Sequence, residues 1–243
     1  MATYRLDISY DGAAFKGWAV QPGLRTVQGE LDIAIARVLG TPAPLTVAGR
    51  TDAGVHALAQ VASLSTDAPV PESFLRSLNA LTGADLAITG VTEVEGFDAR
   101  RHARSRRYRY RVELGEPPSP FERGRAYHCP HPLDREALAE CAAMLLGTHD
   151  FTAFTPTETE HVRFERNVYE AAWEDEDDRI LKFEIEADAF MRNMVRVLVG
   201  TMLEAGGGRR DPASFRRLLE GAARADAGVT APPHGLYLIG VTY

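Results

Sequence analysis

The residues best suited to chemistry lie in a short glycine-containing run, GRTDAGVHA, at residues 49–57. Within it, Arg50 and Asp52 are two positions apart, and in an extended stretch such residues face the same way, so the guanidinium can hold the carboxyl group ionised. An ionised carboxylate on a loop can act as a nucleophile or as a general base. A tight connection in which Asp52 makes a local turn hydrogen bond explains the pattern equally well. The spacing alone leaves both interpretations open.

Arginines dominate a second segment, which reads ARRHARSRRYRYRV from residue 99 onward. No Asp or Glu interrupts this segment, and tyrosines alternate with its arginines. Because the planar guanidinium group suits phosphates and base faces, the segment favours contact with RNA over a solvated surface crossed by salt bridges. We expect Arg101, Arg104 and Arg106 to line a groove for RNA, and the acidic block at residues 174–178 to lie far from that groove.

Two further arginines, Arg192 and Arg196, fall within an apolar stretch at residues 190–204 that predicts a deeply buried helix. Four positions apart on a helix, the two side chains share one face. A buried guanidinium group needs a carboxylate or a phosphate partner. The acid-rich strand around Glu184 can supply that partner, and so can Asp52.

The sequence contains weak signals for metal or cofactor binding. His128, Cys129 and His131 superficially resemble a metal cluster, but no second Cys or His pair at zinc spacing accompanies them. Walker loops, dinucleotide fingerprints and serine nucleophile elbows are absent from the sequence. The triple glycine at residues 206–208 follows a predicted helix, which is typical of a helix cap. We therefore expect no metal and no cofactor.

The composition is that of a globular protein. The chain has 243 residues, of which 45% are hydrophobic and 25% charged, so it forms one or two folding units with a sizeable core. No apolar run approaches the ~20 residues of a membrane helix, no signal-peptide pattern is present, and two cysteines are too few for a disulfide framework. We therefore expect a cytoplasmic protein. The net charge of −7 argues only weakly against a nucleic-acid partner, because binding of a polyanion depends on where the charges lie and not on their sum.

The elements that position the candidate residues follow an order that occurs twice. Helices are expected at residues 27–39, 71–81, 134–146 and 190–204, and after Pro212. Strands are expected at residues 4–10, 45–48, 60–64, 86–94, 107–114, 162–173, 179–187 and 236–241. This pattern predicts an α+β protein with helices packed on a largely antiparallel sheet. We divide the chain into halves at residues 1–102 and 103–243, where the charge pattern changes.

Eight stretches of the chain resemble, in the same order, the bacterial tRNA pseudouridine synthase A family. They are YDG…F.GW (10–18), TVQGEL (26–31), GRTDAGVHA (49–57), FDAR (97–100), RRYRY (106–110), DFTAF (150–154), DAFMRNMVRVLVGTMLEAG (188–206) and TAPPHGLYL (230–238). The chain departs from the family pattern at Ala19, where many relatives carry Gln.

The resemblance implies two ferredoxin-like halves joined in one mixed, largely antiparallel sheet, and a homodimer without cofactor or metal. It implies an isomerase that converts uridine to pseudouridine at positions 38, 39 and 40 of the tRNA anticodon stem-loop. The roles that it implies for single residues are these: Asp52 is the nucleophile, Arg50 flanks it, Arg196 pairs with it, Tyr108 stacks on the target base, Leu236 lines the base pocket, and Arg104 and Arg106 contact phosphates.

Two other functions fit part of the pattern. A non-catalytic RNA-binding protein built from the same halves would keep the run of arginines and tyrosines, but would have no need for the Asp52 loop. A uridine-modifying enzyme for another substrate class, such as ribosomal RNA, would keep both features.

Overall fold

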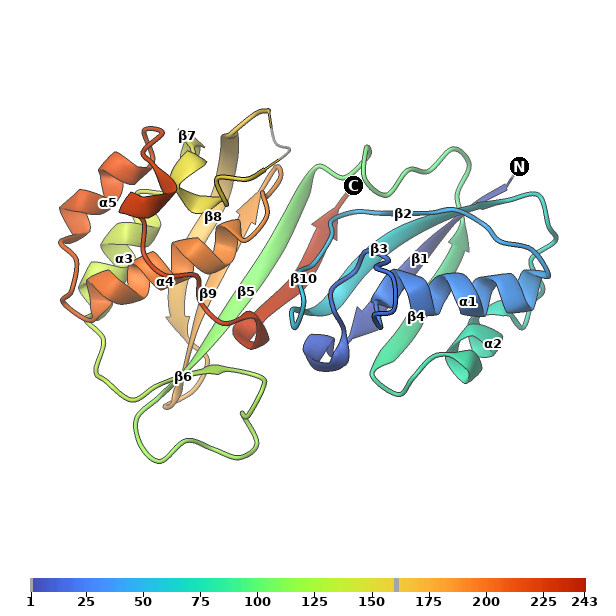
Figure 1. The fold of residues 1–243 in the computed structure, drawn as a ribbon, viewed down its shortest axis with the longest axis horizontal. Helices are drawn as coiled ribbons and strands as arrows, with labels where there is room; N and C mark the ends of the chain where they lie inside the picture. Colours follow the sequence, from blue (N-terminus) through green and yellow to red (C-terminus); the bar gives the residue numbers. More distant parts are fainter. Residues whose placement is uncertain (1, 160–161) are drawn as a thin grey trace. The chain divides into compact units, whose positions relative to one another are not determined.

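The computed structural model describes residues 2–159 and 162–243 (Figure 1). Their contacts define two compact units. Unit 1 comprises Met1–Arg104 together with Tyr237–Tyr243, and unit 2 comprises Ser105–Leu236. The division made from the sequence differs from these units, because it assigns the C-terminal strand to the second half of the chain.

Unit 1 contains a largely antiparallel sheet and two helices. The strands run in the order β4-β1-β3-β10, with β2 paired to β3; β1 is antiparallel to both of its neighbours, and β10 is parallel to β3. The elements are β1 (Ala2–Tyr10), α1 (Val27–Leu39), β2 (Leu45–Val47), β3 (His56–Thr66), α2 (Phe74–Leu81), β4 (Leu86–Glu93) and β10 (Leu236–Thr242), with a short 3₁₀ turn η1 at Gly12–Ala14.

The helix α1 shows why the local sequence folds as predicted. The side chain of Thr26 accepts a hydrogen bond from the amide of Gly29 and so caps the helix, which ends at Gly40 in the left-handed conformation (φ 72°). Leu31 and Ile35 lie one turn apart and are fully buried. Burial of this apolar face against the sheet stabilises the unit by removing hydrocarbon from water.

Unit 2 repeats the plan with strands in the order β5-β9-β8-β7, all antiparallel, and a short parallel strand β6 on β5. In Figure 1 the helix α4 crosses one face of strands β8 and β9. The elements are β5 (Ser105–Leu114), β6 (Tyr127–Cys129), α3 (Arg135–Ala143), β7 (Gly147–Asp150), β8 (Glu165–Asp175), β9 (Ile180–Ala187), α4 (Met194–Gly206) and α5 (Pro212–Leu218).

The α+β class and the largely antiparallel pairing predicted from the sequence are confirmed. The predicted start of the helix at residue 190 is wrong, because α4 begins at Met194. Asn193, the residue just before α4, has a left-handed backbone conformation (φ 61°). A right-handed α-helix cannot continue through such a residue, so the helix does not extend back to residue 190. Arg192 therefore lies in a turn, and the argument that it shares a helix face with Arg196 fails.

The arginines of β5 pair with acidic side chains of unit 2. Arg109 donates to Glu184 on the neighbouring strand β9 at 2.7–2.8 Å, and Arg107 lies 3.1 Å from the same carboxylate. Burial by itself raises the pKa of Glu184, but the hydrogen bond and charge of Arg109, together with the charges of Lys182 and Arg107, outweigh it, so that pKa lies below its ordinary value. Arg107 and Arg109 thus form a surface crossed by salt bridges, whereas their sequence pattern favours contact with RNA.

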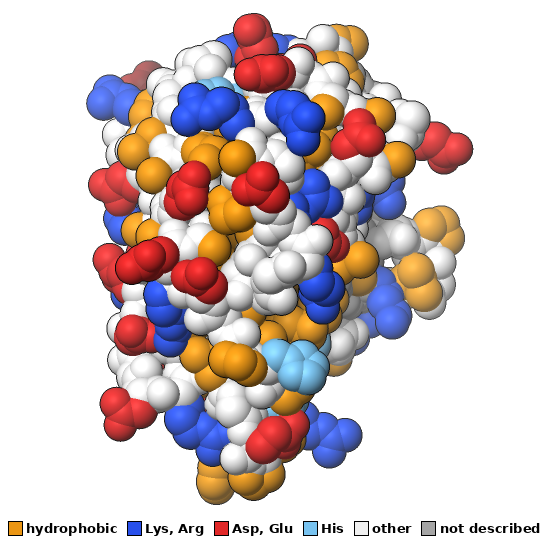
Figure 2. Space-filling view, turned by 90° about the vertical axis from the view of Figure 1, so that its left-hand side faces the viewer, with side chains coloured by type: hydrophobic (Ala, Val, Ile, Leu, Met, Phe, Trp, Pro, Cys, Tyr) orange, Lys and Arg blue, Asp and Glu red, His pale blue; other side chains and the backbone are white. Residues whose placement is uncertain are grey.

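The acidic block contacts the C-terminal part of the arginine run. Glu176 of that block accepts hydrogen bonds from Arg111 on β5 at 2.8–3.2 Å, and Arg111 also binds Glu122 at 2.6 Å. The face of unit 2 seen in Figure 2 carries acidic and basic side chains intermixed. That face therefore presents no field of a single sign to a polyanion.

No helix in the described ranges is long and apolar enough to cross a membrane. Among the same residues, no group of three or more His, Cys, Asp or Glu side chains is arranged to hold a metal ion. The imidazole of His128, one of the residues singled out in the sequence, instead bonds the carbonyl of Gly115 at 2.8 Å.

Candidate active site

Asp52 lies in the loop that joins β2 to β3, and its side chain is half-buried. Arg50, two residues earlier, is exposed, and Thr51 between them is buried. The carbonyl of Asp52 accepts a hydrogen bond from the amide of Val55 at 3.2 Å, which closes the loop into a turn. The carboxylate is therefore carried on a short, folded connection.

A segment from the N-terminal part of the chain, residues 10–18, holds this loop from one side. The hydroxyl groups of Tyr10 and Thr51 are hydrogen-bonded at 2.7 Å, and the amide of Trp18 donates to the carbonyl of Thr51 at 3.0 Å. Burial raises the pKa of Tyr10 to about 12, so the phenol remains neutral at physiological pH. Thr51 is thus fixed through both its side chain and its backbone.

Glycines permit the close approach of the two segments. Gly17 has φ +92°, and a Cβ there would lie 2.9 Å from the carbonyl oxygen of Thr51. At Gly12 a Cβ would lie 2.0 Å from the carbonyl oxygen of Val55. The amide of Gly54 donates to the carbonyl of Phe15 at 3.2 Å. We call residues 10–18 the clamp segment, because backbone groups on both sides of Asp52 are bound to it.

In unit 2, Tyr108 lies on β5 with only 7% of its surface exposed. Its ring meets that of Phe190 edge-on, with centroids 5.0 Å apart and planes inclined at 81°. Phe190 therefore packs the tyrosine ring in one orientation. Arg106, two residues earlier on the same strand, donates to the carbonyl of Asp188 at 2.9 Å.

Arg196, in the first turn of α4, is held by groups on two segments. Its Nε donates to the carbonyl of Ala231 at 2.7 Å, and its Nη1 donates to the Oδ1 of Asn193 at 3.1 Å. The amide of Ala231 in turn donates to the carbonyl of Arg196 at 3.0 Å. The guanidinium group is thus oriented by backbone and amide oxygens, and Glu184, one of the partners considered from the sequence, binds Arg107 and Arg109 instead.

Leu236 follows the short 3₁₀ turn η4 (Pro233–Gly235) and is 5% exposed. The hydroxyl of the buried Tyr110 donates to the carbonyl of Pro232 at 2.9 Å, and a Cβ on Gly235 would lie 2.7 Å from the tyrosine ring. Burial raises the pKa of Tyr110 far above its ordinary value, so this phenol acts as a neutral donor. The turn before Leu236 is therefore packed on Tyr110.

The predicted site residues fall into two sets. Asp52 and Arg50 lie together in one loop of unit 1, and the exposed Arg104 ends the first chain segment of that unit. Unit 2 contains the other four predicted residues, which lie on or next to three of its elements: Arg106 and Tyr108 on β5, Arg196 on α4 and Leu236 after η4.

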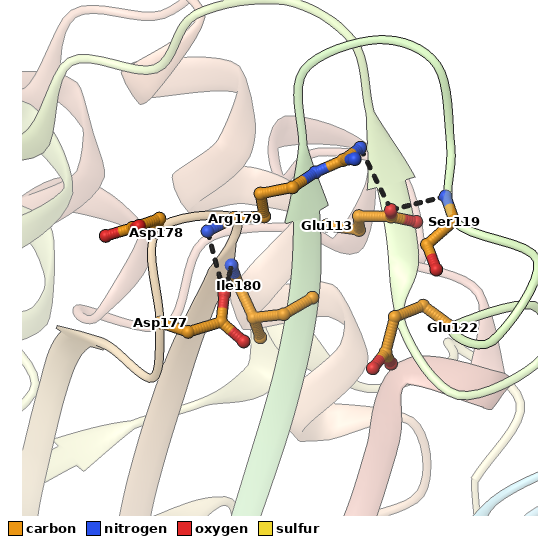
Figure 3. Close-up of a pocket in the computed structure, with 7 residues that line it drawn as sticks. All are labelled: Glu113, Ser119, Glu122, Asp177, Asp178, Arg179 and Ile180. Carbon is orange, nitrogen blue, oxygen red and sulfur yellow. Dashed lines mark hydrogen bonds and ion pairs between the residues drawn. The ribbon is translucent and has the colours of Figure 1, made fainter.

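A cavity of about 350 Å³ in unit 2 involves none of these residues (Figure 3). Arg179 and the amide of Ser119 both donate to the buried carboxylate of Glu113, at 3.2 and 2.6 Å. The remaining lining is mostly acidic, with Glu122, Asp177 and Asp178. A cavity of this charge does not suit a polyanionic ligand.

The clamp segment is the part of the site that sequence reasoning missed. Its glycine-containing pattern YDG…F.GW was visible in the sequence. Nothing in the spacing indicated that it folds onto residues 51–56, because the two segments are some 40 positions apart in the chain.

Comparison with known proteins decides the family. A protein from a Geobacillus species named tRNA pseudouridine synthase A is 41% identical over 239 residues, which cover 97% of this chain and 96% of the relative. The chain belongs to the tRNA pseudouridine synthase A family. A synthase of the same name from Acetivibrio thermocellus is 40% identical and covers 100% of both chains, so that match includes the Asp52 loop.

The family model described as tRNA pseudouridine synthase matches residues 141–243, a range that includes Arg196 and Leu236. Among solved structures, a Cbf5-Nop10-Gar1 complex aligns with a TM-score of 0.35 and 13% identity, over 82% of this chain and 54% of the other. A similarity this low supports no argument about the site.

Proposed function

We propose that this member of the tRNA pseudouridine synthase A family isomerises uridine to pseudouridine at positions 38, 39 and 40 of the tRNA anticodon stem-loop, with Asp52 as the nucleophile. The observation that carries the proposal is the Asp52 loop, whose backbone is bound to the clamp segment on both sides of a half-buried carboxylate. A reacting group held this way is pre-positioned for attack.

The reaction suits the residues available. Pseudouridine formation breaks the N1–C1′ glycosidic bond, turns the uracil ring and joins C5 to C1′. No electron or phosphoryl group is transferred, so the reaction calls for no redox cofactor. A carboxylate can attack the ribose C1′ or the uracil ring, or can remove a proton after a glycal-like step. Each of these routes requires an ionised Asp52.

The proposal assigns roles to the other residues as follows. Tyr108 offers its ring to the target base, which must leave the stack of the stem, and the edge-on contact with Phe190 supports that role by fixing the ring. Arg196 pairs with the Asp52 carboxylate, Arg50 flanks it, and Leu236 lines the base pocket. Arg104 and Arg106 contact phosphates of the stem.

The enzyme works as a homodimer in the cytoplasm and needs no metal ion for the chemical step. The homodimer and the independence from metal are what the family resemblance implies, and the cytoplasmic location rests on the composition of the chain and its two cysteines. Sedimentation of the purified chain, with and without tRNA, measures its oligomeric state directly.

The test is release of tritium from RNA labelled at uracil C5, run in parallel on tRNA and ribosomal RNA. We expect the wild-type protein to release tritium from tRNA, and the variant Asp52→Asn to release none while its affinity for tRNA stays within a few-fold. The amide keeps the shape of the side chain but removes its charge. Turnover by Asp52→Asn above about one per cent of wild type would exclude Asp52 as the nucleophile.

The same assay separates the alternatives. Tight tRNA binding without any tritium release is the result expected of a non-catalytic RNA-binding protein. Release from ribosomal RNA and not from tRNA is the result expected of an enzyme for the other substrate class. Mapping the modified nucleotides in tRNA tests the assignment to positions 38, 39 and 40.

A further inference from the structure

His56 is a buried side chain that the proposed chemistry does not use. It is the first residue of β3, four positions after Asp52, and 3% of its surface is exposed. Its ring stacks on that of Tyr237 in β10, with centroids 4.6 Å apart and planes inclined at 18°. The stacking fixes the plane of the imidazole, and the hydrogen bond described next determines which of its edges faces the clamp segment.

The Nδ1 atom of His56 binds the clamp segment. It lies 3.0 Å from the amide nitrogen of Gly12 and 3.0 Å from the carboxylate of Asp11. A backbone amide can only donate, so its bond requires an Nδ1 without a proton, and Asp11 then lies beside the ring without a hydrogen bond to it. Asp11 at the same time accepts from the amide of Ala13 at 3.0 Å, which holds its carboxylate within the turn η1.

This hydrogen bond lies where the backbones of residues 12 and 55 are in close contact. The backbone of Gly12 is so close to the carbonyl of Val55 that a Cβ on the glycine would lie 2.0 Å from its oxygen. The two backbones therefore meet directly, and the imidazole that follows Val55 supplies the acceptor. At the other end of the turn, the amide of Gly54 donates to the carbonyl of Phe15 at 3.2 Å.

Together the two bonds connect residues 54–56 to both ends of the turn at residues 12–15. The amide of Val55, between them, donates to the carbonyl of Asp52 at 3.2 Å. A shift of the turn is therefore transmitted to the residue that carries the carboxylate. Misplacement of a reacting group by about 1 Å can lower a rate by about 100-fold.

We propose that His56 is a positioning residue for the reaction: its Nδ1 accepts the Gly12 amide and so sets the position of the Asp52 carboxylate. The inference rests on the proposed function of Asp52. It assigns to His56 no contact with the substrate, so its loss should slow the reaction without weakening tRNA binding.

Three substitutions test the role of one nitrogen atom. In His56→Asn the side-chain oxygen can occupy the place of Nδ1, in His56→Gln the polar group corresponds to Nε2 instead, and His56→Leu has no acceptor. We expect the Gln and Leu variants to lose about 10- to 100-fold in single-turnover rate with tRNA affinity unchanged within about threefold. The Asn variant should stay within about fivefold of wild type.

A matched control comes from the same strand. Leu58, two residues after His56, has 57% of its surface exposed, and Leu58→Asn should leave the rate unchanged. Thermal unfolding of every variant shows which of them fold. If the Leu variant fails to fold, the comparison of the Asn and Gln variants still tests the inference, because only Asn places an acceptor where Nδ1 lies.

A second measurement does not depend on activity. The Gly12 amide should exchange slowly with solvent in the wild type and in His56→Asn, and fast in His56→Gln and His56→Leu. An Asn variant as slow in turnover as the Leu variant would overturn the inference, and so would unchanged exchange at Gly12 in the Leu variant. If the wild-type protein releases no tritium at all, the proposed function fails, and amide exchange alone decides whether His56 holds the turn.

Discussion

Replacing Arg101 and Arg104 by alanine is expected to flatten the salt dependence of tRNA binding, whereas replacing Arg109 is expected to leave it unchanged. The Arg101 side chain is 85% exposed, with Asp98 at 3.8 Å, and Arg104 is exposed as well. Arg109, in contrast, donates two hydrogen bonds to Glu184. An arginine that already neutralises a carboxylate releases few counterions when RNA binds.

The size of the effect follows from counterion release. Each phosphate contact contributes about 0.7–0.9 to the slope of log affinity against log salt concentration. Loss of two contacts should therefore reduce the slope by about 1.4–1.8. When salt is raised fourfold, the wild-type protein should lose about tenfold more affinity than the double variant does.

The Arg109→Ala variant should change stability instead. Its removal leaves the 14% exposed carboxylate of Glu184 with Arg107 and Lys182 as the cations that remain near it. Loss of a charged hydrogen bond in this setting costs about 1–2 kcal/mol, which is about 2–8 °C in Tm for a chain of this size. Because Arg107 and Lys182 still lie near Glu184, we expect the loss of unfolding free energy to be smaller than that caused by leaving a buried charge without any partner.

Equilibrium binding of tRNA over a series of salt concentrations, with thermal unfolding alongside, checks both variants. Asp52→Asn serves as the background, so that turnover does not alter the RNA during the titration. An unchanged slope in Arg101→Ala/Arg104→Ala would refute the assignment of these arginines to the RNA surface. A slope reduced as strongly in Arg109→Ala would refute the distinction drawn from the salt bridges.

Two further predictions follow from single side chains. Tyr108→Leu should lower turnover strongly because a stacking face worth about 1–3 kcal/mol is lost, whereas Tyr108→Phe should retain most of the activity in the tritium assay. A Phe variant as inactive as the Leu variant would show that the hydroxyl takes part in proton transfer. For Glu184, the lowered pKa of the folded protein means that its stabilising contribution is fully present above the ordinary value of 4.5 and is lost as the pH falls through the lowered pKa of the folded state. Glu184→Gln should therefore unfold at lower temperature than wild type at pH 7, and the difference in Tm should shrink as the pH is lowered below 4.5. A difference that stays the same over the whole range of acid pH would contradict this.

Local patterns predicted the elements that depend on local interactions. The helix at residues 27–39 carries its cap and its apolar spacing in its own sequence, and the structure has it at the same residues. The sequence indicated a strand from Gln60, but β3 begins at His56. Ala57 and Ala59 give a weak strand signal, although His56 and Ala57 pair with β10.

Long-range pairing was not accessible in the same way. The absence of acids near Arg109 in the sequence favours a surface for RNA, but β9 brings Glu184 opposite Arg109 in the sheet. Pairing register is set by which face of each strand is buried and by the turns between strands, over a separation of 75 positions. The contact between the clamp segment and the Asp52 loop depends on glycine positions whose partners lie elsewhere in the chain, so neither segment alone reveals it.

Unit 1 is built from two pieces of chain, and this has a consequence for biosynthesis. On the ribosome, residues up to Arg104 emerge before any of unit 2, and residues 237–243 emerge only after all of unit 2. Until then His56 lacks the Tyr237 ring, and Ala99 lacks the hydroxyl of Tyr243, which donates to its carbonyl at 2.9 Å. Because domains generally fold as they are translated, unit 2 can be complete while the unit that carries Asp52 is not. A nascent chain interrupted within unit 2 therefore carries the carboxylate without the strand that completes its surroundings, and premature termination yields no finished catalytic unit.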